Sequence, residues 1–108
     1  MLISTTVTGD DKPVLTADFT PYLDRLVGSD VTLSSVVVVC RAADSESAAL
    51  DASASSRPDG SVSVSSPYAQ QRLASLVEGA DYIIEFRGTF SDGSVETIQV
   101  FQPCRNNL

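Results

Sequence analysis

Few side chains in this sequence could carry out covalent or acid–base chemistry. Its thiols are Cys40 and Cys104, and it has no histidine. Without histidine, the chain cannot form the Ser-His-Asp or Cys-His arrangements that activate a nucleophile. It also lacks the G-x-S-x-G turn of many hydrolases, the phosphate-binding P-loop and the glycine-rich dinucleotide fingerprint. The sequence therefore predicts a protein that is not an enzyme and that uses no cofactor.

Close pairs of acidic residues outside the predicted strands are the other candidates for chemistry. They are Asp10 with Asp11, and Asp44 with Glu46. Their oxygens could bind a calcium ion weakly, but neither segment has the alternating ligands of a calcium loop, so we favour solvated loop charges. Two carboxylates that hydrolyse a glycoside would need an enclosing cleft, and a domain of 108 residues has little room for one.

The two cysteines are predicted to be reduced thiols. Two cysteines without histidine cannot complete a zinc site of four protein side chains unless carboxylates join them, so no metal site is predicted. Disulfides are rare in cytosolic proteins. A bond between Cys40 and Cys104 would need their Cα atoms to lie within about 7 Å, and the sequence leaves that distance open.

The chain carries a strong negative charge. Fourteen Asp and Glu residues against seven Lys and Arg residues give a formal charge of −7. No cluster of basic residues offsets this charge locally, so we predict no binding to the phosphates of nucleic acids. The arginines are scattered singly. They are either solvated charges or surface ion pairs, or some of them are anchors in a protein interface, where arginine is enriched.

No segment of the sequence is predicted to enter a membrane. The longest apolar run is VVVVC at residues 36–40, far shorter than the roughly 20 residues that a membrane helix needs. The first residues, MLISTTVTGDDKP, lack the basic and apolar regions of a secretory signal. We therefore expect a soluble protein made in the cytoplasm.

Alternation of apolar and polar residues, interrupted by turn-forming residues, predicts mostly β-strands. The predicted strands cover residues 2–8, 13–19, 31–43, 61–65, 71–76 and 82–101, the last range being a hairpin. A helical turn is expected near residues 21–27, with Thr20 as its N-cap, Pro21 at its first position and Gly28 at its end.

The middle of the chain combines the most apolar strand with a polar loop. Residues 31–43 hold four consecutive valines, which is typical of a central strand covered on both faces. A strand packed against another subunit would show the same pattern. Residues 44–60 are rich in Ser, Ala and Asp and are predicted to form a long mobile loop, with SAALDA as a weak edge strand. Residues 66–70 are expected to be a connection.

The hairpin near the C-terminus is the clearest pattern. Tyr82, Ile84 and Phe86 alternate with Ile83, Glu85 and Arg87, which gives one apolar and one mixed face. The dipeptide Asp-Gly at residues 92–93, placed between two such runs, is a strong hairpin signal.

The spacing Leu-x-x-Gly-x-x-Tyr stands just before this hairpin, as Leu76, Gly79 and Tyr82. It resembles the tyrosine corner of immunoglobulin-like and fibronectin type III sandwiches, in which the Tyr hydroxyl bonds to backbone a few residues upstream. The Cys-Trp-Cys pattern of antibody domains is missing. The sequence thus predicts an all-β protein: one immunoglobulin-like or fibronectin III-like antiparallel β-sandwich of about seven or eight strands, spanning residues 1–108.

The pattern of the whole chain resembles a family of small virion proteins of tailed bacteriophages. The resemblance rests on TADFTPYLDRLVGSDVTLSSVVV near the start, DGSVSV in the middle and LVEGADYIIEFRGTFSDGSVETIQV near the end. In that family an Ile commonly follows the Gly-Asp or Gly-Glu turn, and Val31 stands in that place here. A Trp often follows in the next strand of the relatives, and this chain has none.

The resemblance implies a non-enzymatic structural protein of the virion, made in the host cytoplasm. Relatives act as fibre–tail adaptors or head decoration proteins, so the implied partners are capsid, neck, tail or fibre proteins and copies of the chain itself. We expect contacts through the hairpin, the loop at 44–60 and the termini, which could become ordered on assembly. The candidate interface residues are Ala48, Ala49, Leu50, Tyr68, Phe90 and Phe101.

A second hypothesis is a stand-alone recognition domain of the adhesion or carbohydrate-binding type. Sugar-binding platforms expose aromatic rings for stacking. Tyr22, Tyr68 and Phe90 are the residues that could serve in this way.

Overall fold

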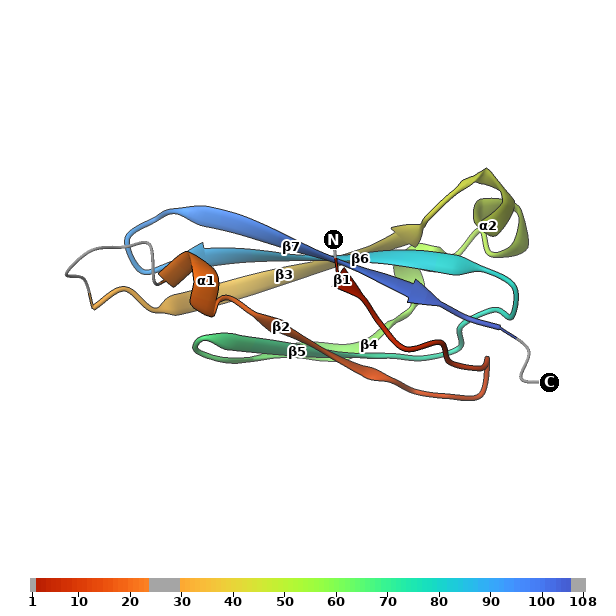
Figure 1. Cartoon of the computed structure of the whole chain (residues 1–108), viewed down its shortest axis with the longest axis horizontal. Helices are drawn as coiled ribbons and strands as arrows, with labels where there is room; N and C mark the ends of the chain where they lie inside the picture. Colours follow the sequence, from red (N-terminus) through yellow and green to blue (C-terminus); the bar gives the residue numbers. More distant parts are fainter. Residues whose placement is uncertain (1, 24–29, 106–108) are drawn as a thin grey trace.

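The computed structural model describes residues 2–23 and 30–105. In this part of the chain, seven strands lie in two sheets that pack face to face (Figure 1). The four-stranded sheet has the order β1-β7-β6-β3, and the three-stranded sheet has the order β2-β5-β4. The strands are β1 (Leu2–Ile3), β2 (Val14–Asp18), β3 (Leu33–Ala42), β4 (Pro58–Ser65), β5 (Tyr68–Leu73), β6 (Asp81–Phe90) and β7 (Val95–Pro103). The prediction of an all-β sandwich is confirmed.

The predicted C-terminal hairpin is present as β6 and β7. The two strands pair antiparallel along nearly their whole length, with Ile84 opposite Val100 and Phe86 opposite Ile98. Gly93 takes a φ of +89° in the turn, a left-handed conformation that glycine adopts without steric cost. The alternating apolar residues of both strands therefore face the second sheet.

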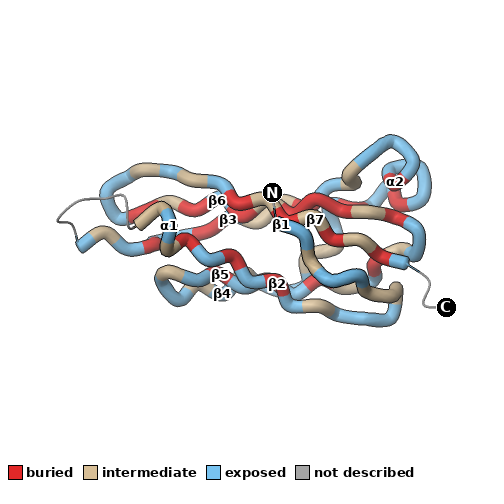
Figure 2. The backbone as a smooth tube through the Cα atoms, viewed as in Figure 1, coloured by how far each residue is buried: buried red, intermediate tan, exposed pale blue. Residues whose placement is uncertain are grey.

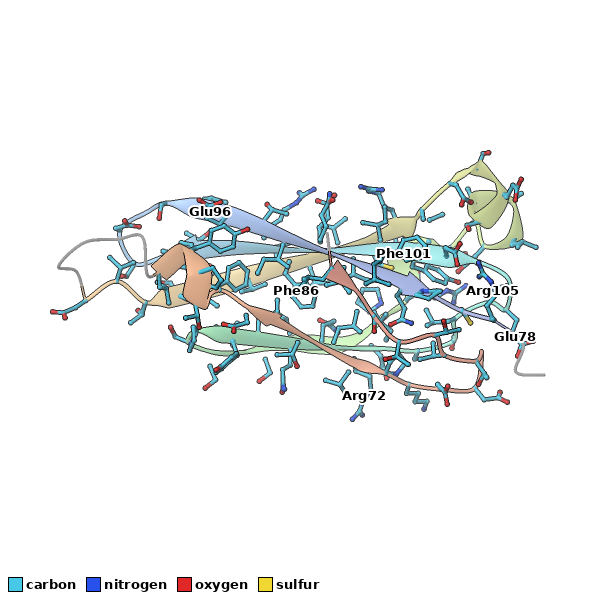
Figure 3. All side chains as sticks on the ribbon, in the orientation of Figure 1. Arg72, Glu78, Phe86, Glu96, Phe101 and Arg105 are labelled. Carbon is cyan, nitrogen blue, oxygen red and sulfur yellow. The ribbon has the colours of Figure 1, made fainter. Side chains whose placement is uncertain are left out.

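Aromatic and aliphatic side chains fill the space between the sheets. Figure 2 shows the buried residues running along both layers, and Figure 3 shows Phe86 between them. Phe19, which directly follows β2, packs edge-on against Phe90, with ring centroids 5.9 Å apart. This contact depends on Gly88, because a Cβ there would stand 2.9 Å from Cε1 of Phe19. A residue without a side chain thus lets the ring lie against β6.

The Leu-x-x-Gly-x-x-Tyr segment forms the turn that leads into β6. Leu76 and Tyr82 are buried, and Gly79 has a φ of +90°. The Tyr82 hydroxyl accepts a hydrogen bond of 2.8 Å from the backbone N–H of Val77. This is the upstream backbone contact that the spacing predicts.

Strand β3 is an edge strand, and the prediction of a central strand was wrong. Its partner in the sheet is β6, and it forms one border of the four-stranded sheet. Its burial alternates only in part, and the side chain of Val37 is 62% exposed. The run of valines reflects strand preference at an edge rather than cover on both faces.

The segment at 44–60 is not a long loop with a weak edge strand, so that prediction was also wrong. It contains α2 (Ser45–Leu50) and a 3-10 helix, η1 (Ala54–Ser56), before β4 begins. The Asp44 carboxylate accepts a hydrogen bond of 2.7 Å from the N–H of Ser47 and so caps α2. The hydroxyl of buried Ser47 accepts one of 2.8 Å from the N–H of Asp81, which holds α2 against the start of β6.

Other boundaries differ from the predictions in smaller ways. The first strand covers residues 2–3 rather than 2–8, although Val7 forms an isolated bridge with Cys104. Residues 68–70, expected in a connection, belong to β5. The predicted helical turn is present as α1 (Thr20–Leu23), and its remainder falls in residues 24–29, outside the described part of the chain.

Candidate functional site

The most strongly bonded ionic group of the described residues is buried under the tyrosine corner. Asp51, just after α2, accepts two hydrogen bonds from Arg57, at 2.8 Å from Nε and 2.7 Å from Nη2. It accepts a third from the Tyr82 hydroxyl at 2.7 Å and a fourth from the N–H of Ser53 at 2.9 Å. The bonds from Arg57 lower the pKa of Asp51 to about 2. Burial raises the pKa of Tyr82 to about 12.

This buried cluster has a structural role. The four bonds to Asp51 fill its accepting positions, so the charge is compensated within the fold. It connects the segment of α2 and η1 to β6, which are distant in the sequence. Sequence reasoning treated Arg57 as one of several scattered arginines, and no local motif marks its pairing with Asp51.

Both thiols are free and buried. Burial raises the pKa of Cys40 to about 12 and also raises that of Cys104. Cys40 stands opposite Ile84 of β6, whereas the N–H of Cys104 bonds to the carbonyl of Ala80. Four residues of a strand span roughly 13 Å, so the two thiols are too far apart for a disulfide. The two cysteines are therefore not bonded to each other in this structure.

The acidic pairs considered as calcium ligands bond within their own loops. Asp44 caps α2, and this bond lowers the pKa of its carboxyl. Oδ2 of Asp11 accepts from the N–H of Thr8 at 2.9 Å. Within residues 2–23 and 30–105, no group of three His, Cys, Asp or Glu side chains is placed to hold a metal ion.

The outer face of the four-stranded sheet combines apolar side chains with an ionic row. Glu85 is at the centre of this row. It accepts from Arg87 at 3.0 Å, from Arg41 at 3.3 Å and from Gln99 at 3.2 Å. The bonds from Arg87 lower the pKa of Glu85. We call this surface the four-stranded face; by register its other members include Ile3, Val37, Val39, Asp81, Ile83, Val95, Thr97 and Phe101.

The outer face of the three-stranded sheet is much more polar. We call it the three-stranded face; it is formed by Val14, Thr16, Asp18, Asp59, Ser63, Ser65, Tyr68, Gln70 and Arg72. Figure 3 shows Arg72 pointing away from the sandwich on this side. Tyr68 is 47% exposed and stands opposite Asp18 on one neighbouring strand and Ser65 on the other. The two faces thus differ in chemistry, since hydroxyl and amide groups dominate this one.

An open groove runs between the sheets where β1 ends. One part, of about 420 Å³, lies beside Leu2, Tyr22 and Ile98. A second part, of about 330 Å³, lies beside Leu2, Val14 and Val100. The groove exists because β1 pairs with only Val100 and Phe101 of β7 in the described structure. It carries Asp18, whose pKa is lowered by the hydroxyl of Thr20.

The candidate interface residues from the sequence do not form one surface. Ala48, Ala49 and Leu50 are exposed on α2, with Leu50 54% exposed and its Cδ1 lying near Gly79. Tyr68 lies on the three-stranded face, and Phe101 lies half-buried on the four-stranded face.

Phe90 was predicted wrongly as an interface or sugar-stacking residue. Its side chain is 2% exposed and packs in the core against Phe19. Its position in β6 shows why, because residues 82, 84, 86, 88 and 90 all point inward. The same alternation was visible in the sequence and would have placed Phe90 in the core.

None of the helices in the described part of the chain has the length and apolar character needed to cross a membrane. No family model, curated protein or solved structure matches the chain.

Proposed function

We propose that this protein is a non-enzymatic structural module of a tailed-phage virion, an adaptor or decoration protein that binds other virion proteins. The observation that carries the proposal is the four-stranded face. Its exposed Val37 and half-buried Val39 and Phe101 surround a row of arginine side chains. Apolar and arginine side chains together are characteristic of protein interfaces.

The charge of this face also favours a protein partner. By register its charged members are Arg41 and Arg87 against Asp81 and Glu85, so the face has no net charge (two basic minus two acidic), on a chain whose total is −7. A partner that covers this face meets a surface that is less negative than the chain as a whole. Acidic virion proteins could therefore dock here without the repulsion that the rest of the surface imposes.

The topology supports the resemblance to immunoglobulin-like virion proteins. The spatial order β2-β5-β4 in one sheet corresponds to strands B-E-D of an immunoglobulin constant-type sandwich. The order β3-β6-β7 in the other sheet corresponds to strands C-F-G. The hydrogen bond between Tyr82 and Val77 adds the tyrosine corner at the start of the strand equivalent to F. These features support the fold on which the proposed role depends.

Particle incorporation tests the proposal. The tagged protein is produced during assembly of the phage that encodes it, and the particles are purified on a density gradient and analysed by quantitative mass spectrometry. We expect a fixed number of copies per particle, reduced by Phe101→Glu on the four-stranded face and unchanged by Gln70→Glu on the three-stranded face. Both variants add one negative charge at a strand position on the outer face of a sheet. The pair therefore separates the loss of a contact on the four-stranded face from a general effect of added negative charge. Absence of the wild-type chain from particles would refute the proposal.

A carbohydrate-binding role is favoured by a different observation, the exposed ring of Tyr68. Hydroxyl, carboxylate and amide groups of Ser65, Asp18 and Gln70 stand around it by register, and such groups can bond sugar hydroxyls beside a stacking ring. Specific and saturable binding on a glycan array, lost in Tyr68→Ala and kept in Phe101→Glu, would support this second role against the first.

A further inference from the structure

The outer edge of β3 presents a row of backbone groups to which no other strand of the described residues bonds. In the ladder with β6, Ala43 donates its N–H to the carbonyl of Asp81, and the pairing continues residue by residue. Antiparallel bonding alternates along a strand, so Val37, Val39 and Arg41 bond to β6. The backbone groups of the residues between them point away from β6; these residues are Val36, Val38, Cys40 and Ala42.

A hydrogen bond closes the beginning of this edge, and η1 and β4 lie close to β3. The N–H of Leu33 also points outward, and it donates to the hydroxyl of Ser66 at 3.0 Å. Among the described residues, no comparable bond reaches the outward groups of Val36, Val38 or Cys40. The sequence of β3, LSSVVVVCRA, also lacks the residues that commonly protect an edge, since it has no Pro, no Lys and no acidic residue.

The other borders of the two sheets suit strand pairing less well. Strand β1 has only two residues. Strand β2 has five and ends in Asp18, and β4 carries Pro58 and an irregular register between Asp59 and Ser63. In a chain of charge −7, self-association along β2 or β4 would bring carboxylates together, whereas β3 has Arg41 as its single charge.

We propose that two copies of this chain pair antiparallel through β3, about a two-fold axis at Val38. This register joins Val38 to the second copy's Val38 by two backbone hydrogen bonds and joins Val36 to the second copy's Cys40. On the four-stranded face it places exposed Val37 opposite the second copy's Val39, a β-branched pair of the kind that stabilises adjacent strands. The two four-stranded sheets become one continuous sheet. The inference deepens the proposed function by naming a second copy as one partner of the module.

Amide hydrogen exchange, followed by NMR in dilute and concentrated samples, tests the register directly. We expect the amides of Val36, Val38 and Cys40 to exchange at least about tenfold more slowly in the concentrated sample. The amides of Val37 and Val39 already bond to β6, so their exchange should change much less. Equal exchange at both concentrations, or slower exchange confined to another edge, would overturn the proposal.

A pair of matched substitutions tests the same contact by light scattering after size exclusion. Val37→Lys and Val14→Lys each place a lysine in an edge strand, on the outer face of its sheet. The paired residue of the neighbouring strand is Arg87 in the first case and Arg72 in the second. Their parent side chains are 62% and 49% exposed. We expect Val37→Lys to weaken the dimer at least about tenfold, because the lysine meets Val39 and lies diagonal to Arg41 of the second copy. Val14→Lys should leave the dimer intact.

A charge reversal at the same position adds a stricter criterion. Val37→Glu should weaken the dimer less than Val37→Lys, since the carboxylate lies diagonal to Arg41 of the second copy. Simple repulsion between acidic chains would give the opposite order, which would contradict the proposal. Failure of the two ideas is distinguishable: a monomer that still joins particles overturns the pairing alone, and a dimer that is absent from particles overturns the virion role alone.

Discussion

The hydroxyl of Tyr82 lies 2.7 Å from Oδ2 of Asp51, a residue 31 positions earlier in the chain, and donates its proton to that carboxylate. The same oxygen of Tyr82 accepts from the N–H of Val77 at 2.8 Å. One buried phenol therefore connects the turn before β6 with the segment that follows α2. In this protein the tyrosine corner extends into an ionic cluster, because Asp51 also holds Arg57 with two hydrogen bonds.

Removing that hydroxyl should destabilise the fold. Tyr82→Phe keeps the ring in the core but leaves the N–H of Val77 without its partner and removes one of the two hydrogen bonds to Oδ2 of Asp51. We expect a loss of about 1–3 kcal/mol in the free energy of unfolding, measured by urea denaturation. Tyr68→Phe removes a hydroxyl from an exposed ring and serves as the control, with a change of less than about 0.5 kcal/mol. Equal effects of the two substitutions would contradict the role of the corner.

The hairpin and the corner could be predicted from the sequence because their signals are local. Alternation over β6 and β7, the Asp-Gly turn and the spacing from Leu76 to Tyr82 all lie within one continuous stretch. The edge position of β3 depends on which strand pairs with which across the chain. A run of valines shows that the segment forms a strand but not how many neighbours it has.

The helix α2 was missed for another physical reason. It buries only Ser47, so it has no apolar periodicity to detect. A signal was present in Asp44, an N-cap residue followed by Glu46 in the first turn and by alanines that favour helix. The pairing of Asp51 with Arg57 could not be predicted, since its geometry arises only after α2 and η1 fold against β6.

The stability of the protein should depend on pH through Asp51. Its pKa is lowered to about 2 by the bonds from Arg57, against about 3.9 in an unfolded chain. A lowered carboxyl pKa gives stability that is complete above the unfolded pKa and is lost as the pH falls through the folded one. We expect Asp51→Asn to be less stable than wild type at pH 7 and the difference to shrink, by about 2 kcal/mol, between pH 5 and pH 2. A difference independent of pH over this range would contradict the assignment.

The contact between Gly88 and Phe19 predicts that an added methyl group will strain the core. In Gly88→Ala the new Cβ would stand 2.9 Å from both Cε1 of Phe19 and Cδ1 of Leu33. We expect a loss of about 1–3 kcal/mol in the free energy of unfolding, measured by thermal and urea denaturation. The double variant Gly88→Ala with Phe19→Leu tests the cause, because a smaller side chain relieves the clash. A coupling energy above about 0.5 kcal/mol between the two changes is expected, and strict additivity would show that the clash is not the cause.

The thiols should be unreactive in the folded protein. Only the thiolate attacks disulfide and alkylating reagents, and burial raises the pKa of Cys40 to about 12 and raises that of Cys104 as well. We expect almost no reaction with an aromatic disulfide reagent at pH 8 in native buffer. Two equivalents should react promptly after denaturation in guanidinium, because both cysteines are free. If the thiols react only when the fold opens transiently, their reaction rate falls as the stability of the fold rises. The less stable Tyr82→Phe variant should therefore react faster than wild type. Rapid native reaction that is equal in the two proteins would show that a thiol is accessible in the folded state.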